Sequence, residues 1–165
     1  VFAQLTGLYS RRYMESLMVR DAALSRQKGL PLTLLALDID DFKGFNAANG
    51  SEAGDRALKA VAGMLKTELR ASDLPIRYDD DEFLVALYDS NANQAIIIAD
   101  RLCRKTQQLA LPGLDGVRIT ASIGIGEFTG ADSDMRTVIM RAEQAMKIAK
   151  TSGRNRVVAQ PSQTA

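Results

Sequence analysis

Two kinds of hydrophobic pattern alternate along the chain. Apolar residues recur at intervals of three and four, the spacing of one helical face, over residues 12–28, 57–69, 92–109 and 135–150. Short apolar or alternating runs, typical of strands, occupy residues 32–39, 74–88 and 117–128. This order of elements predicts an α/β layer protein with a mixed sheet rather than a doubly wound parallel sheet.

Two of these strand-like runs have particular features. Residues 32–39 are nearly all apolar and are too short for a helix, which predicts a central strand buried on both faces. Residues 74–88 contain four consecutive acidic residues at positions 79–82 and predict a hairpin with an acidic turn. The polar segment "GFNAANGSEAGD" predicts a loop between elements, and residues 159–165 a disordered tail or linker.

Composition narrows the possible functions. A chain of 165 residues that is 46% hydrophobic fits one globular domain, and 21 basic against 20 acidic residues predict no bulk attraction to nucleic acid or to a membrane surface. Histidine is absent and Cys103 is the single cysteine, which excludes an internal disulfide, zinc sites built on Cys and His, and His-dependent nucleophilic catalysis. No apolar run spans a bilayer and no signal peptide is evident, so a cytoplasmic domain is expected.

Carboxylates are therefore the candidate chemical groups. Asp38, Asp40 and Asp41 lie at the end of the predicted central strand, where α/β sheets usually bind ligands. Such a group suits Mg²⁺, which takes one or two protein carboxylates together with phosphates and water. A solvated strand end is the alternative interpretation of these residues.

Six short segments of the chain have an order and spacing that resemble those of the signature motifs of a known protein family. They are "LTGLYSRR", "LDIDDFKGFN", "GSEAGD", "RYDDDEF", "ITASIGIG" and "AKTSGRN". Together they resemble the GGDEF family of diguanylate cyclases over residues 1–158. The resemblance implies a ferredoxin-like βαββαβ core of the nucleotide-cyclase and polymerase-palm kind. It also implies a homodimer in which two GTP molecules, one per subunit, are joined into cyclic di-GMP.

The resemblance also implies roles for individual residues. Asp38, Glu82 and the Ile39 carbonyl would hold Mg²⁺ or Mn²⁺, and Asp81 would help to deprotonate the attacking hydroxyl. Asn46 and Asp55 would contact guanine, Phe42 and Lys43 would lie beside the phosphates, and Lys150 and Arg154 would bind the terminal phosphates. Taken singly, Lys150 and Arg154 are also ordinary residues for a helix end, and Asn46 is ordinary for a turn.

The hairpin departs from the family pattern. Asp79 and Asp80 stand where the family has two glycines, which accept positive φ in a tight turn and leave room for a ligand. Aspartate tolerates the left-handed region, so the fold is expected to survive. Two added carboxylates would repel a triphosphate, which predicts weak or absent cyclase activity. Ala47, Ser51 and Lys147 also replace common family residues.

A second site is implied at "RASD". Arg70 and Asp73 have the spacing of the family's RxxD inhibitory site for cyclic di-GMP, and Arg101 resembles its secondary arginine. Arginine can present two donors to guanine O6 and N7, and aspartate can accept from N1 and N2. The alternative is a common surface ion pair.

Three functions remain open at this point. The first is a degenerate GGDEF domain that acts as a cyclic di-GMP receptor through Arg70 and Asp73. The second is an active diguanylate cyclase that tolerates Asp79 and Asp80. The third is a dimerisation or scaffold module that binds no nucleotide.

Overall fold

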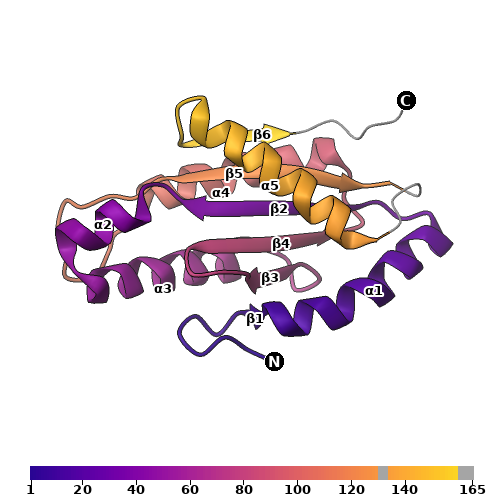
Figure 1. Cartoon of the computed structure of the whole chain (residues 1–165), viewed down its shortest axis with the longest axis horizontal. Helices are drawn as coiled ribbons and strands as arrows, with labels where there is room; N and C mark the ends of the chain where they lie inside the picture. The colour runs from indigo at the N-terminus through magenta and orange to yellow at the C-terminus, as the bar shows by residue number, and fades with distance from the viewer. Residues whose placement is uncertain (130–133, 160–165) are drawn as a thin grey trace.

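The computed structural model describes residues 1–129 and 134–159, which form one six-stranded sheet with helices on its faces (Figure 1). The strands are β1 (Tyr9–Ser10), β2 (Leu32–Ile39), β3 (Leu74–Arg77), β4 (Glu82–Tyr88), β5 (Ala121–Phe128) and β6 (Arg156–Ala159). The helices are α1 (Arg11–Lys28), α2 (Phe42–Asn49), α3 (Ser51–Glu68), α4 (Ala92–Gln108) and α5 (Met135–Thr151).

The four inner strands have the expected ferredoxin-like arrangement. The order across the sheet is β1-β3-β4-β2-β5-β6, and β2 pairs antiparallel with both β4 and β5. The edge strands β1 and β6 pair in parallel with β3 and β5. Helices α3 and α4 cover one face and α1 and α5 the other, each over its own hydrophobic cluster (Figure 1). The predicted mixed α/β class is confirmed.

The central strand β2 is buried at all eight positions, as its apolar run predicts. Its side chains alternate between the two hydrophobic clusters, with Leu35 and Leu37 in one and Leu34 and Ala36 in the other. The same alternation directs Asp38 to the face covered by α1 and α5. The strand therefore positions a carboxylate on that face at its C-terminal end.

Strand β5 lies unusually close to α5. A Cβ atom built on Gly124 would be 2.0 Å from the backbone oxygen of Ala142 and 2.2 Å from the backbone nitrogen of Met146. A Cβ atom on Gly126 would be 2.7 Å from the oxygen of Val138. Glycine is required at both positions because the helix backbone occupies the space of a side chain.

The predicted loop at 44–55 is wrong. This segment forms most of α2 and the first residues of α3, which begins at Ser51 rather than near Ala57. Phe42 and Phe45 anchor α2 on the core, and Gly50, with φ of 92°, separates the two helices. Tertiary packing overrides the low helix propensity of the Asn and Gly residues here.

Other element boundaries differ less from the prediction. Strand β5 begins at Ala121 rather than Val117, because Ala121 already pairs with Ile39, the last residue of β2. The short edge strands β1 and β6 were not predicted. Residues 160–165 of the predicted tail lie outside the described residues. None of the helices in the described ranges is long and apolar enough to cross a bilayer.

Candidate functional site

The site at the hairpin is built on two neighbouring strands. Asp38 of β2 is paired directly with Glu82 of β4, so both side chains leave the same face of the sheet. The Ile39 amide donates to the Asp81 carbonyl at 3.4 Å, which brings the hairpin turn to the end of β2. The structure thus brings together the residues expected to hold a metal: Asp38, Ile39 and Glu82, with Asp81 beside them.

Asp38 is surrounded by groups of both charges. Its side chain is 10% exposed and forms an ion pair with Lys150 of α5. Its pKa is raised from 3.8 to about 7, mainly by burial; Lys150 lowers the pKa and the nearby Asp81 carboxyl raises it. A single lysine therefore does not compensate for the burial and crowding of these carboxylates.

Glu82 is more strongly perturbed. Its pKa is raised from 4.5 to about 9, mainly by burial and next by the neighbouring Glu143 carboxyl of α5. Sequence reasoning missed Glu143, although it stands two helical turns before Lys150 and so faces the same way. Glu143 is the neighbouring group that raises the Glu82 pKa most, whereas Asp81 acts on Asp38, so the two hairpin acids have different surroundings.

These groups fit a divalent cation. Asp38 Oδ1 and Glu82 Oε2 are buried oxygen atoms without a hydrogen-bond partner. Within the described ranges, no three Asp, Glu or Cys side chains form a preformed metal cluster. Mg²⁺ needs only one or two carboxylates when nucleotide phosphates and water complete its shell. Unpaired buried oxygens among carboxylates are the donors that such an ion would satisfy.

Asp40 is committed elsewhere. Its carboxylate accepts hydrogen bonds from the hydroxyl groups of Thr120 (2.7 Å) and Ser122 (2.6 Å) and from the Asn155 amide (3.0 Å). These bonds join the end of β2 to the start of β5 and to the segment before β6. Asp40 therefore stabilises the fold and does not belong to the cluster around Asp38.

The hairpin turn has no residue with positive φ. The amides of Tyr78 and Asp79 both donate to the Glu82 carbonyl, at 2.9 and 3.1 Å, so Asp79, Asp80 and Asp81 form a three-residue loop. None of the three aspartates has the left-handed conformation that a two-residue glycine turn requires. The predicted tolerance of aspartate for positive φ is therefore not needed here, because the turn is a three-residue loop rather than a two-residue turn.

Arg77 supports this turn. Its guanidinium donates to the carbonyls of Asp79 (3.4 Å) and Asp80 (2.8 Å), and the Asp79 carboxylate accepts from the Asp80 amide (2.9 Å). The side chains of Asp79 and Asp80 remain exposed. The turn is thus stable with two exposed carboxylates, and these lie next in sequence to Asp81 and Glu82.

The residues expected to contact the nucleotide come from α2, from α3, and from the end of α5 and the turn after it. Asn46 of α2 packs against Gly54 of α3, where a Cβ atom would be 1.9 Å from the Asn46 Oδ1 atom, itself buried and unpartnered. Asp55 follows Gly54 and is exposed. Gly54 was not singled out from the sequence, yet only its missing side chain leaves room for Asn46.

The remaining phosphate-site residues are at helix ends. Phe42 and Lys43 begin α2, with Lys43 exposed and Phe42 packed partly against the core. Arg154 has φ of 62°, and its amide donates to the Ala149 carbonyl at 2.9 Å. Of these residues, Lys150 alone is joined to the carboxylate cluster by a described ion pair.

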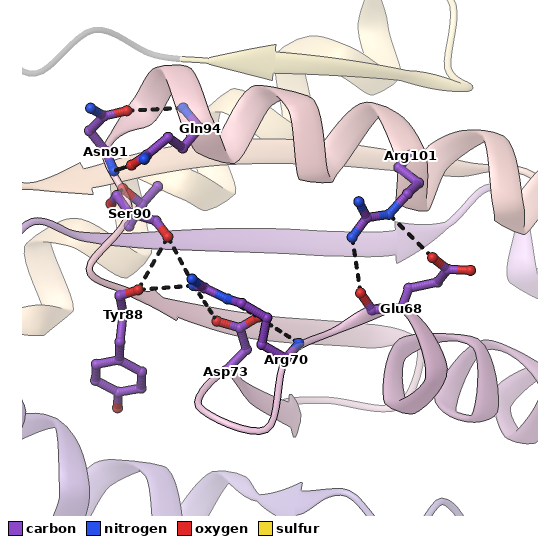
Figure 2. A network of polar contacts seen from close by, with 9 residues as sticks. Glu68, Arg70, Asp73, Tyr88, Ser90, Asn91, Gln94 and Arg101 are labelled. Carbon is purple, nitrogen blue, oxygen red and sulfur yellow. Dashed lines mark hydrogen bonds and ion pairs between the residues drawn. The ribbon is translucent and has the colours of Figure 1, made fainter.

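The Arg70 and Asp73 pair forms a second polar site (Figure 2). Asp73 is buried and accepts three hydrogen bonds from Arg70: from the amide (2.9 Å), from Nε (3.2 Å) and from Nη2 (2.8 Å). The Arg70 side chain is 52% exposed, that of Asp73 only 1%. Arg70 can therefore meet a ligand, whereas the Asp73 carboxylate is directed at Arg70 rather than outward.

Arg101 lies on α4 and is held by Glu68, the last residue of α3 (Figure 2). Its Nε is 3.2 Å from Glu68 Oε2, and its Nη2 donates to the Glu68 carbonyl at 2.9 Å. The structure contains no direct contact between Arg70 and Arg101 among its described hydrogen bonds and ion pairs.

Comparisons with known proteins identify the family to which this chain belongs. A family model described as "Diguanylate cyclase, GGDEF domain" matches residues 2–156. The chain is 34% identical over 155 residues to the diguanylate cyclase DosC of Escherichia coli, and 35% identical over 158 residues to the response regulator PleD of Caulobacter vibrioides. These matches cover 93% and 94% of the chain but 34% and 35% of the relatives, so the chain spans about a third of their length.

Solved structures give the same result. The GGDEF domain of DgcB from Caulobacter crescentus, in complex with c-di-GMP, superposes with a TM-score of 0.90 at 28% identity, covering 96% of this chain and 94% of that one. The diguanylate cyclase SiaD from Pseudomonas aeruginosa, in complex with its activator SiaC, gives a TM-score of 0.91 at 31% identity, covering 96% and 61%. This chain belongs to the GGDEF-domain family of diguanylate cyclases.

Proposed function

We propose that this GGDEF domain acts in cyclic di-GMP signalling as a receptor, and that its turnover of GTP is weak or absent. The observation that carries the receptor function is the geometry of Arg70. Its guanidinium is oriented by a buried carboxylate and is half exposed, which leaves a planar cation available to a ligand. Such a group can stack on guanine and donate to its acceptor edge.

In this proposal Asp73 acts on Arg70 instead of making the predicted contact with guanine. With its side chain 1% exposed and both oxygens bonded to Arg70, it orients the arginine and does not read guanine N1 and N2. Arg101 is a secondary contact in this proposal and would have to leave Glu68 to reach the ligand. The known complex of the DgcB GGDEF domain with c-di-GMP supports this ligand class for the family.

The weak turnover follows from the hairpin. Asp79 and Asp80 place two exposed carboxylates next to Asp81 and Glu82, where the phosphates of GTP would approach. Glu82 already has a raised pKa partly because of Asp79. Each further negative charge at short range opposes binding of a triphosphate.

An active cyclase is the second candidate, favoured by the intact cluster of Asp38, Asp81 and Glu82. When bound by Asp38, Glu82 and the Ile39 carbonyl, Mg²⁺ or Mn²⁺ would offset charge on the α-phosphate and the leaving group. Asp81 would accept the proton of the 3′-hydroxyl of one GTP. The hydroxyl oxygen would then bond to the α-phosphorus of the other GTP, and pyrophosphate would leave.

In this candidate mechanism the remaining residues bind and orient the nucleotide. Asn46 and Asp55 would fix the guanine, and Phe42 and Lys43 would lie beside the phosphates. Lys150 and Arg154 would bind the terminal phosphates, with Lys150 moving from Asp38 to do so. Because each subunit would supply one GTP, this activity needs a homodimer.

One set of measurements separates the candidates. The purified domain, stripped of nucleotide, is titrated with cyclic di-GMP by calorimetry as wild type and as Arg70→Ala. A matched control is Arg136→Ala on α5, whose side chain is 88% exposed. We expect loss of binding in Arg70→Ala alone; unchanged affinity would refute the receptor function.

The enzymatic candidate needs its own assay. The domain is incubated with GTP and Mg²⁺ or Mn²⁺, and cyclic di-GMP is measured by chromatography against Glu82→Ala. Product well above this control would establish the cyclase. Absence of binding to both nucleotides by the folded domain would leave a dimerisation or scaffold function.

A further inference from the structure

We propose that Ser90 is a positioning residue for the Arg70 site, and that its hydroxyl fixes the Arg70 guanidinium before a ligand binds. The inference rests on the proposed receptor function for the identity of the ligand, cyclic di-GMP. Ser90 lies between β4 and α4, distant in sequence from Arg70, and belongs to none of the motifs found in the sequence. Figure 2 shows its hydroxyl directed toward the Arg70 side chain.

The contacts of Arg70 are concentrated on one edge of its guanidinium. The two hydrogens of Nη2 have three acceptors within reach, Asp73 Oδ1 (2.8 Å), the Tyr88 carbonyl (3.0 Å) and Ser90 Oγ (3.0 Å), so one hydrogen is shared; Nε donates to Asp73 Oδ2 (3.2 Å). Within the described part of the chain, Nη1 makes no hydrogen bond. The ligand is therefore met by Nη1 and by the flat face of the guanidinium.

The Ser90 hydroxyl is suited to this role because its own proton is already used. Ser90 Oγ donates to the Tyr88 carbonyl at 3.2 Å, which leaves its lone pairs for Arg70 Nη2. Ser90 is 2% exposed, so water does not compete freely for this acceptor. The Tyr88 carbonyl and the Ser90 hydroxyl therefore hold the same Nη2 atom that donates to Asp73.

The backbone of Ser90 is itself held in place. Its carbonyl accepts a hydrogen bond of 2.7 Å from the hydroxyl of Thr33, which is fully buried on β2. The next residue, Asn91, caps α4 in a reciprocal pair with Gln94, with both hydrogen bonds at 2.9 Å (Figure 2). Ser90 Oγ is thus a fixed acceptor attached to the central strand and to a helix start.

A fixed acceptor lowers the entropic cost of binding. An exposed arginine side chain has many rotamers, and ordering it on binding reduces affinity. Three acceptors around Nη2 restrict these rotamers in the free protein. Removing one neutral hydrogen bond to Arg70 is expected to weaken cyclic di-GMP binding about 3- to 10-fold.

The test uses Ser90→Ala, with Ser90→Thr to restore the hydroxyl and Asn91→Ala as the matched control. Asn91→Ala weakens the adjacent helix cap but keeps the Ser90 hydroxyl. The side-chain ¹⁵N signals of Arg70, assigned by comparison with Arg70→Lys, report its ordering without any ligand. We expect exchange-averaged Nη signals in Ser90→Ala, and ordered signals in wild type, Ser90→Thr and Asn91→Ala.

The cyclic di-GMP titration provides the second readout. We expect the affinity to fall in Ser90→Ala, to recover in Ser90→Thr and to remain near wild type in Asn91→Ala. Unchanged Arg70 signals in Ser90→Ala, or an equal loss of affinity in Asn91→Ala, would overturn the positioning role. If the wild type binds no cyclic di-GMP while the Arg70 signals respond to Ser90→Ala, the receptor function fails and the positioning role of Ser90 stands.

Discussion

Lys150 at the end of α5 forms an ion pair with Asp38 at the end of β2, across 112 positions of sequence. This contact joins the last of the six sequence motifs to the second. It places the only described cationic partner of Asp38 among several carboxylates. The pair therefore partly offsets the negative charge at Asp38.

Replacing Lys150 by Met is expected to raise the pKa of Asp38 above its present value of about 7, because Lys150 is the group that lowers it. A pH titration followed by the carboxyl ¹³C shift of Asp38 measures this change. Lys147→Met, on the same helix, is the control and is expected to leave the pKa of Asp38 unchanged. An unaltered Asp38 titration in Lys150→Met would show that the ion pair does not persist in solution.

The pKa of Glu82, raised to about 9, makes stability depend on pH. Between about pH 4.5 and 9 the unfolded chain has released this proton while the folded protein keeps it, so the free energy of unfolding falls as pH rises. Glu82→Gln removes this pH-dependent fall in the free energy of unfolding, because glutamine does not titrate. In urea unfolding without metal, we expect the variant to be more stable than wild type at pH 9 and equal to it at pH 4.

The comparison for this pH effect is Asp115→Asn, which changes an exposed carboxylate in a loop. It is expected to leave the pH profile of unfolding as in wild type. Equal profiles for wild type and Glu82→Gln would contradict the raised pKa.

Substituting both Asp79 and Asp80 by Gly is expected to tighten GTP binding by roughly 10- to 100-fold, because two carboxylates near the phosphates are removed. The double change to Asn keeps the side-chain volume and removes the charge. If charge is the obstacle, titration with GTP and Mg²⁺ gives a similar gain for both double variants. A gain in GTP affinity for the Gly double variant alone would assign the effect to side-chain volume. No gain in GTP affinity for either double variant would show that Asp79 and Asp80 do not weaken GTP binding.

Gly124→Ala is expected to destabilise the domain by about 3 kcal/mol or more, because its Cβ would overlap the α5 backbone. Gly63→Ala in α3 is the matched control, since nothing lies within 4 Å of a Cβ there. The control is expected to gain about 0.5–1 kcal/mol from helix propensity. Thermal unfolding measures both, and similar melting temperatures would refute the close packing of β5 on α5.

Much of the fold follows from local pattern. The uninterrupted apolar run of residues 32–39 indicates the central strand, and the period of the helical stretches indicates α1, α4 and α5 almost to their ends. Local pattern failed at α2, whose helix depends on Phe42 and Phe45 packing against the core. It also failed at the edge strands β1 and β6, which are too short to have a period of their own.

The candidate sites divide in the same way. Asp38, Glu82, Arg70 and Asp73 could be named from ordered motifs, since motif spacing is a property of the chain alone. Tertiary contacts decided the surroundings of these residues. The Asp73 carboxylate is bonded to Arg70, and Asp40 accepts from Thr120 and Ser122 at the start of β5. Glu143 and Ser90 join the two sites from other elements. Hydrogen bonds and pKa values depend on which groups the fold brings within a few ångströms, and no sequence distance specifies that.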